Sequence, residues 1–224
     1  ISMPVVDNER RLVGIVTIDD VVDIIDQENT EDFQKMAAMH PSDEEYLKTS
    51  PLTLARHRIT WLLILMISAT LTGNIIIRFN DVLQSVVVLA SFIPMLMDTG
   101  GNSGSQSSTL IIRGLALGEI KTSDIFKVIW KEIQVSAIVG LFLSLLNFVR
   151  IYFLKKIDLN ISLTVCITLF LTVMLAKIIG GVLPILAKKL KLDPAIMASP
   201  LITTIVDAAA LTIYFSVATW ILHI

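Results

Sequence analysis

The chain has 224 residues, of which 54% are hydrophobic and 17% charged, and its formal net charge is −2. This composition is too apolar for an ordinary soluble domain, and the charge argues against a nucleic-acid-binding surface. The single cysteine, Cys166, excludes an intramolecular disulfide framework. No cleavable signal peptide is visible, and because the sequence opens in a folded-looking stretch we expect a piece of a longer protein.

Residues 1–27 have the pattern of a small soluble unit. Residues 4–6 and 12–17 predict two strands joined by a turn at 7–9. Apolar residues at helical spacing follow, and Thr17 can cap that helix. Such a β-β-α unit is too small to bury a core alone.

Residues 28–54 are polar and acidic. Thr30, Glu31 and Asp32 predict the start of a helix with acidic residues in its first turn. Pro41 and Pro51 are expected to interrupt regular structure in the segment. Two interpretations remain open here. The segment is either a solvated linker helix or a charged connecting helix that binds cations and moves.

Five apolar segments follow, each compared with the roughly 20 residues that cross a bilayer. They are residues 59–77, 82–112, 125–149, 161–187 and 199–222. The second is long for one simple span, so it must tilt, bend or contain a break. The fold class predicted is an all-α membrane protein with five transmembrane helices.

Basic residues predict the orientation, because Lys and Arg concentrate on the cytoplasmic side. A cytoplasmic amino end places nine basic residues inside: Arg56, Arg58, Arg113, Lys121, Lys127, Lys131, Lys188, Lys189 and Lys191. Four fall outside: Arg78, Arg150, Lys155 and Lys156. The carboxyl end would then lie outside.

Residues 92–113 place Gly, Ser, Asn, Gln, Thr and Asp at membrane depth. Lipid cannot hydrogen-bond a backbone, so such sequence is buried in protein or lines a watery path. Gly101, Ser105 and Thr109 (or Ser108) form one helical stripe, beside the amides of Asn102 and Gln106. Helix packing alone explains the glycines but not the amides. This stretch predicts a pore or a substrate site, with Asp98 either at its outer mouth or paired with Lys177.

Asp207 is the only acid in the apolar run 199–222. A carboxylate at that depth costs several kcal/mol unless it faces water, a cation or a partner, so Asp207 is a candidate functional residue. Ser199 and Thr203 precede it at spacings of four and share its helix face. The alternative is a protonated Asp207, or one locked to Lys177.

The available ligands favour a hard cation. Carboxylate, hydroxyl and carbonyl oxygens suit Mg²⁺, Ca²⁺ or Mn²⁺, and a single carboxylate suits Mg²⁺, which keeps its waters. A symmetric dimer would double the charge of Asp207. No phosphate-binding loop, Ser/His/Asp set or metal-spaced histidine pattern is visible, so we expect neither an enzyme nor an organic cofactor.

The motifs resemble one family, the MgtE magnesium transporters, over nearly the whole chain. The matching pieces are PVVDNERRLVGIVTIDDV, which is similar to the end of a CBS domain, the acidic connecting segment, FIPMLMDTGGNSGSQSSTLIIRGLALGEI and LDPAIMASPLITTIVDAAALTIYF. The resemblance implies a Mg²⁺-selective channel that imports the ion down its electrochemical gradient. It also implies a homodimer in the cell membrane, with hydrated Mg²⁺ in an interfacial pore lined by the second and fifth helices.

The resemblance also implies roles for particular residues. Asp207 would be the central metal site, and the pore would be lined by Gly101, Asn102, Ser105, Thr109, Ser199 and Thr203. Relatives are expected to carry Asn where this chain has Ser105 and Ser199. Cytosolic Mg²⁺ would close the channel through candidate carboxylates at Asp19, Asp20, Asp23, Asp26, Glu28, Glu31, Asp32, Glu44 and Glu45.

The implied organisation has three parts: a CBS remnant over 1–27, a plug helix over 28–54 and a pore domain over 55–224. Because most of the sensor is missing, we expect weakened closure by internal Mg²⁺. Two alternatives stay open: a cation-coupled carrier with a broken-helix site, and a membrane sensor that transports nothing. The sequence does not separate Mg²⁺ from Mn²⁺, Co²⁺ or Ca²⁺.

Overall fold

The computed structural model describes residues 2–223, the side chain of Ser199 excepted. It is 79% helical, with one two-stranded sheet. In chain order the elements are β1 (Ser2–Val6), β2 (Leu12–Thr17), α1 (Ile18–Met36), α2 (Pro51–Arg78), α3 (Asn80–Ser85), η1 (Val87–Phe92), α4 (Ile93–Ala116), η2 (Thr122–Asp124), α5 (Ile125–Phe148), η3 (Val149–Leu154), α6 (Leu159–Lys189), η4 (Pro194–Met197) and α7 (Ser199–Leu222).

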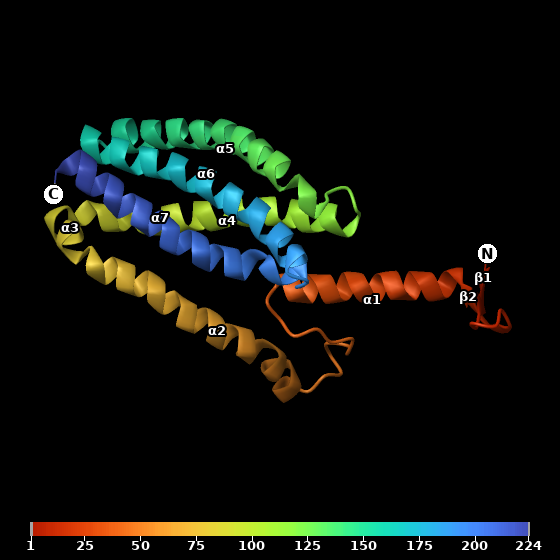
Figure 1. Ribbon diagram of the computed structural model, residues 1–224. Helices are drawn as coiled ribbons and strands as arrows, with labels where there is room; N and C mark the ends of the chain where they lie inside the picture. Colours follow the sequence, from red (N-terminus) through yellow and green to blue (C-terminus); the bar gives the residue numbers. More distant parts are fainter. Residues whose placement is uncertain (1, 224) are drawn as a thin grey trace.

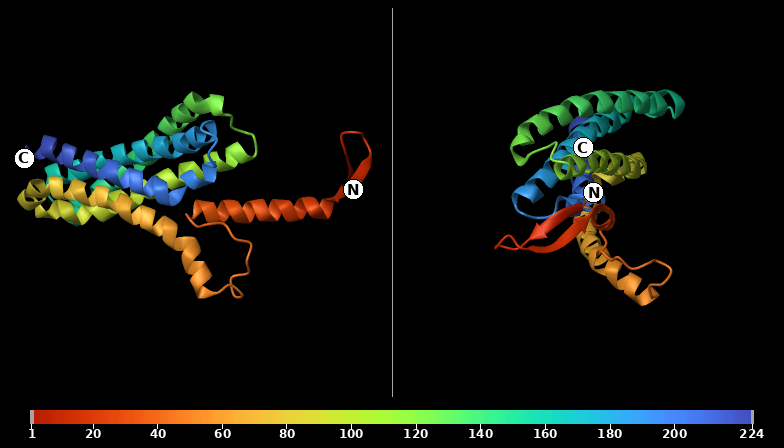
Figure 2. Two further views of the ribbon diagram at one scale, coloured as in Figure 1. Left: turned by 60° about the horizontal axis from the view of Figure 1, so that its bottom comes forward. Right: turned by 90° about the vertical axis from the view of Figure 1, so that its right-hand side faces the viewer.

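The amino-terminal hairpin and its helix form as the sequence predicts. β1 and β2 pair antiparallel, with Ser2 opposite Thr17. Thr17 caps α1: its side chain accepts a hydrogen bond from the Asp20 N–H, and the Asp20 carboxylate accepts one from the Thr17 N–H at 2.7 Å. No residue of the two strands or of α1 is buried. The helix carries the hairpin away from the helical bundle (Figure 2).

The acidic segment differs from its prediction. Thr30 does not start a helix but lies inside α1, where its hydroxyl donates to the Asp26 carbonyl at 2.8 Å. α1 ends at Met36, and no helix covers residues 37–50. Pro41 removes a backbone donor, and Ser50 then caps a new helix with Pro51 in its first turn. The segment 28–54, expected to be one connecting helix, therefore consists of the end of α1, a turn-rich linker over 37–50 and the start of α2.

Four stretches of the described chain are long and apolar enough to cross a membrane: Pro51–Arg78, Thr122–Leu154, Leu159–Lys189 and Pro194–Leu222. They contain the predicted segments 59–77, 125–149, 161–187 and 199–222. The remaining predicted segment, 82–112, falls largely on α4. That helix has 24 residues, but its Gly, Ser, Asn, Gln and Asp make it too polar to qualify by composition.

Of the three possibilities for residues 82–112, a tilt, a bend or a break, the structure shows a break, and it precedes the glycines. The chain leaves the helical conformation at Val86 (φ −136°, ψ 78°) and passes through η1 before α4 begins. The Gly- and Ser-rich stretch itself is continuous α-helix. Its polarity therefore serves helix packing and the surface of α4, not a break in the backbone.

Small residues allow α4 to pack closely against α6 and α7, which both flank it (Figure 1). A Cβ placed on Gly100 would lie 2.7 Å from Thr172 Cγ2 and 2.9 Å from Val206 Cγ1. Gly180 of α6 lies directly against the backbone carbonyl of Gly104. These approaches confirm the packing explanation for the glycines and bring the backbones of neighbouring helices together.

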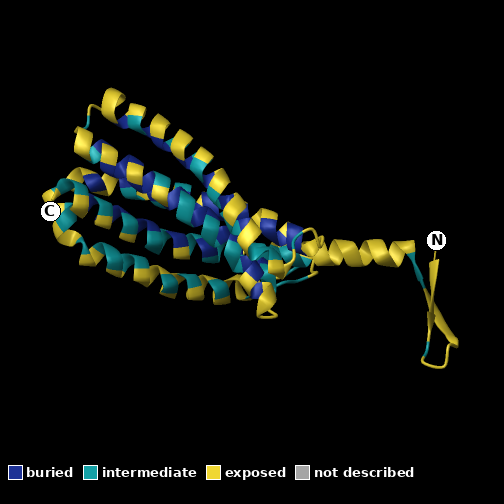
Figure 3. Ribbon diagram, turned by 45° about the horizontal axis from the view of Figure 1, so that its top comes forward, coloured by how far each residue is buried: buried dark blue, intermediate teal, exposed yellow. Residues whose placement is uncertain are grey.

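The most extensive buried cluster lies at the end of the bundle near α3 and the carboxyl terminus. Leu89, Phe92 and Leu96 pack there against residues of α6 and α7, and the Tyr214 hydroxyl donates to the Leu89 carbonyl at 2.9 Å. In contrast, α2 contains no buried residue and diverges from the bundle (Figures 1 and 3). α5 packs against α6 on the other side.

Candidate cation site

Asp207 lies two turns into α7 and is half-buried in the single chain. Within the described residues it makes no hydrogen bond and no ion pair, so the structure contains no Asp207–Lys177 lock. Asp98 on the neighbouring helix α4 also carries a carboxylate, and its charge repels that of Asp207. A cation would stabilise such a pair of acids at membrane depth.

The hydroxyls preceding Asp207 bond to their own helix. Thr203 Oγ1 and Thr204 Oγ1 both donate to the Pro200 carbonyl, at 2.9 and 3.0 Å. Each hydroxyl oxygen keeps acceptor capacity for a water or an ion. The side chain of Ser199, the third member of the predicted stripe, lies outside the described part of the chain.

The second stripe follows the outer surface of α4. Asn102 donates from Nδ2 to Asp98 Oδ1 at 3.1 Å, and Thr109 Oγ1 donates to the Ser105 carbonyl at 2.9 Å. Asp98, Asn102 and Thr109 are exposed, as is Gln106. An open hollow of about 750 Å³ lies here, lined by Asn102, Ser105, Gln106, Thr109 and Leu110. Asp98 is thus held by Asn102 and is not paired with Lys177.

Gly101 connects the two stripes. A Cβ on this residue would lie 2.8 Å from Thr203 Cγ2, so α4 and α7 touch at the level of both predicted pore positions. The structure therefore places Gly101 and Thr203 in contact, with Asn102, Ser105 and Thr109 along the same helix.

The predicted regulatory carboxylates divide into three places. Asp19, Asp20, Asp23 and Asp26 lie on the half of α1 next to the hairpin, where Asp20 serves the helix cap. Glu44 and Glu45 lie in the linker, and Glu45 pairs with Lys48 at 2.8 Å. Glu28, Glu31 and Asp32 instead line a cavity of about 410 Å³ together with Asp193 and Lys188.

Asp193, at the start of η4, was not among the predicted residues. It binds Lys35 of α1 at 2.5 Å, and Lys35 also pairs with Glu31. Burial opposes the charge of Lys35, but the hydrogen bonds that it donates to Asp193 and Glu31 raise its pKa above the usual range. Burial, followed by the charge of Asp193, raises the pKa of Asp32. Among the described residues, no group of three His, Cys, Asp or Glu side chains is placed to hold a metal ion.

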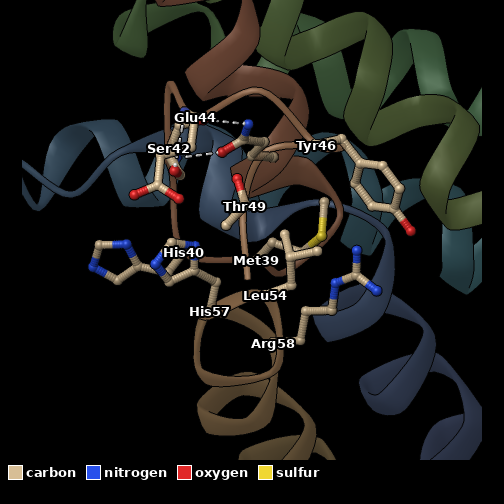
Figure 4. Close-up of a pocket in the computed structure, with 10 residues that line it drawn as sticks. Met39, His40, Ser42, Glu44, Tyr46, Thr49, Leu54, His57 and Arg58 are labelled. Atoms are coloured by element: carbon tan, nitrogen blue, oxygen red, sulfur yellow. Dashed lines mark hydrogen bonds between the residues drawn. The ribbon is translucent and has the colours of Figure 1, made fainter. Parts of the chain in front are cut away.

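The linker between α1 and α2 folds into a pocket of its own (Figure 4). Gln34 bonds the Ser42 backbone twice, through Oε1 at 2.6 Å and Nε2 at 2.8 Å. The His40 and His57 rings lie 5.6 Å apart, although their sequence positions show no ligand spacing. This pocket fixes the linker against the first turns of α2.

Glu132 of α5 is a second residue that sequence reasoning missed. It is buried, and its Oε2 accepts a hydrogen bond from Ser107 Oγ of α4 at 2.7 Å. The available signal was its place in a series of small or polar residues, Glu132, Ser136, Gly140 and Ser144, spaced by four along α5. Lys177 is also buried, in α6.

Comparison with known proteins agrees with this architecture. Residues 93–217, from the start of α4 to near the end of α7, match the MgtE family model, described as a divalent cation transporter. The chain is 41% identical over 223 residues to the magnesium transporter MgtE of Thermus thermophilus, covering 99% of this chain and 49% of that protein. It is 37% identical to the Bacillus subtilis protein of that name, covering 100% of this chain and 49% of the relative.

A third relative, the magnesium transporter MgtE of Enterococcus faecalis, is 30% identical over 97% of this chain and 47% of its own length. The chain spans about half the length of the curated relatives it matches. The family description is that of a transporter, in agreement with the expectation that the chain is not an enzyme. With several long apolar helices and a family match over more than half of its residues, this chain is a multi-pass membrane protein that belongs to the MgtE family.

Proposed function

We propose that the chain forms the pore of a Mg²⁺ channel, with Asp207 as its central metal site. The observation that carries this proposal is the unpaired carboxylate of Asp207 beside the polar stripe of α4, in a family of divalent cation transporters. Gly101, Asn102, Ser105, Thr109, Ser199 and Thr203 would line the path. α4 would be the second of five transmembrane helices and α7 the fifth, with the amino end of the chain in the cytoplasm.

A homodimer explains why the polar surface of α4 lies on the outside of the single chain. Exposed Asp98, Asn102 and Gln106 would otherwise face hydrocarbon, which is costly. A second copy across a two-fold axis would cover this surface and enclose a watery path. The axis would also bring two Asp207 carboxylates to one site.

The ligand chemistry favours Mg²⁺ that keeps its water. The site offers carboxylate, hydroxyl and carbonyl oxygens, and Mg²⁺ dehydrates reluctantly. Ser105 and Ser199 in place of the expected Asn would contact bound waters through shorter side chains, so the choice among Mg²⁺, Mn²⁺, Co²⁺ and Ca²⁺ is where this chain would differ from relatives. A membrane potential of 100 mV favours entry of a divalent ion by about 4.6 kcal/mol.

Gating would act through α1. Its carboxyl-terminal turns reach η4, immediately before α7, through the Lys35–Asp193 pair. Glu28, Glu31 and Asp32 gather there with Asp193, so an internal cation would neutralise several carboxylates and favour docking. In this proposal residues 1–27 are a CBS remnant, 28–54 a regulatory connection and 55–224 the pore domain.

The pore lining can be tested by disulfide cross-linking. In a Cys166→Ala background, Gln106→Cys on the outer surface of α4 should form a cross-linked dimer on oxidation. The cross-link should block Mg²⁺ flux, and reduction should restore it. The matched control is Leu145→Cys, an exposed position on α5. A cross-link at Leu145 with none at Gln106 would place the dimer contact on α5 and contradict the proposal.

A further inference from the structure

A cavity of about 430 Å³ lies between α4 and α5, where the chain passes from one helix to the other, away from the α4–α7 contact. Its walls combine three kinds of side chain. Four are apolar, three acidic and two basic: Leu110, Ile111, Ile120, Val128, Glu119, Asp124, Glu132, Lys127 and Lys131.

Glu132 lies at the buried side of this cavity. It is 9% exposed, and a Cβ placed on Gly181 of α6 would lie 3.0 Å from its Cγ. Ser107 donates to Oε2, and no other hydrogen bond or ion pair of this carboxylate occurs within residues 2–223. Lys177 makes no ion pair with it and does not line the cavity. A buried carboxylate is stabilised by a cationic partner, and the cavity is where one could reach it.

The basic residues of the cavity differ in their availability. Lys127 Nζ is bound to Asp124 Oδ1 at 2.8 Å, so its charge already has a partner. Lys131 is exposed and makes no hydrogen bond or ion pair with the described residues. The cavity therefore holds an unpaired carboxylate at depth and an unpaired ammonium at its mouth.

The surroundings place this mouth at a membrane surface. The membrane span Thr122–Leu154 begins here, and Phe126 and Trp130 of the same turns are 81% and 63% exposed. Aromatic side chains of this kind concentrate at the level of lipid headgroups. Leu110 and Ile111 give the cavity an apolar wall, and of the two only Leu110 is exposed.

We propose that this cavity binds the headgroup of an ammonium-bearing phospholipid of the phosphatidylethanolamine type. The headgroup ammonium pairs with Glu132, the phosphate with Lys131, and the acyl chains leave the cavity past the exposed side chain of Leu110. A purely anionic lipid leaves Glu132 without a counter-charge. The deep carboxylate of Glu132 and the ammonium of Lys131 at the mouth complement a headgroup that carries both charges, whereas Lys131 would repel a bare cation.

Native mass spectrometry of the purified full chain tests the proposal, with phosphatidylethanolamine and phosphatidylcholine of identical acyl chains as probes. The choline headgroup keeps the charge but has no N–H to donate to Glu132. The wild type should retain phosphatidylethanolamine preferentially, and Glu132→Gln, which keeps an acceptor for Ser107, should lose about tenfold in this retention. Glu45→Gln, in the linker, should behave as the wild type.

A second variant separates binding from folding. Lys131→Met should weaken both lipids to a similar degree, because both carry the phosphate, while far-ultraviolet circular dichroism and gel filtration of the variants match those of the wild type. Equal retention of the two lipids by the wild type, or unchanged preference in Glu132→Gln, would overturn the proposal. Loss of all binding on addition of Mg²⁺ would also overturn it, by assigning the carboxylate to the ion.

Discussion

Gly101 and Thr203 come closer together than a side chain on Gly101 would permit, since a Cβ there would lie 2.8 Å from Thr203 Cγ2. This contact joins α4 to α7 one helical turn from Asp207. The packing of α4 against α7 therefore sets the distance between the polar stripe of α4 and the Asp207 carboxylate. The proposed pore therefore depends on the small residues of α4 and α6 as much as on its ligands.

Gly180→Ala should destabilise the bundle. The added Cβ would meet the backbone of Gly104, which cannot rotate away, and overpacking of this kind costs about 1–3 kcal/mol. Gly73→Ala is the matched control, because nothing lies within 4 Å of its added Cβ in α2. Thermal unfolding in detergent should show a lower Tm for Gly180→Ala and an equal or higher one for Gly73→Ala. Equal losses in both would show that the α4–α6 contact is not tight.

Asp98→Asn should weaken Mg²⁺ binding without abolishing transport. The substitution removes the charge opposite Asp207 and keeps a side chain that can bond Asn102. The Mg²⁺ concentration for half-maximal flux should rise several-fold, while Asp81→Asn, in the short helix α3, should leave it unchanged. An unchanged half-maximal concentration in Asp98→Asn would remove this residue from the ion path.

Lys35→Met should release α1 from the bundle. Lys35 is 21% exposed and ties Glu31 of its own helix to Asp193, which caps η4. Spin labels at residues 29 and 190 should report a longer and broader distance in the variant, and inhibition of flux by internal Mg²⁺ should weaken. Lys48→Met breaks a pair confined to the linker and should change neither. An unchanged distance in Lys35→Met would show that other contacts hold α1.

Docking of α1 should also respond to pH through Asp32. Burial and the charge of Asp193 raise its pKa above 3.8 in the docked state, so that state binds the proton more tightly than the undocked one. Protonation therefore favours docking, and this contribution is lost as pH rises through the raised pKa.

Asp32→Asn isolates this effect, because it remains neutral at every pH. Without divalent ions, the variant should dock more fully than the wild type at pH 7, and the difference should shrink toward acid pH as Asp32 of the wild type protonates. The same spin-label distance reports it. A difference that stays constant with pH would rule out Asp32 as the titrating group.

The membrane helices could be read closely from the sequence because uninterrupted apolar runs define them. Residues 125–149 and 199–222 correspond to Ile125–Phe148 and Ser199–Leu222. The break at Val86 could not be predicted, since it lies inside an apolar run. The end of α1 at Met36 could not be predicted either, because the next two residues are alanines, which favour a helix.

The candidate site was accessible to the sequence only in part. Asp207 could be identified because it is the one acid in an apolar run. Thr203 could be identified by its helical spacing from Asp207, and Gly101 by its place in the polar stripe of α4 and by the family resemblance. Asp193 and Glu132 acquire their importance from partners in other elements, Lys35 and Ser107, which are 158 and 25 residues away. Such contacts join residues that are far apart in the sequence, so no local sequence pattern predicts them.

The most direct measurement is Mg²⁺ uptake into liposomes that carry the purified chain, with Asp207→Asn compared with the wild type and with Asp81→Asn. The account predicts flux in the wild type and in Asp81→Asn, and little in an Asp207→Asn protein that is equally folded and dimeric. Equal flux in all three would contradict the central role of Asp207 and move the ion site to the polar face of α4.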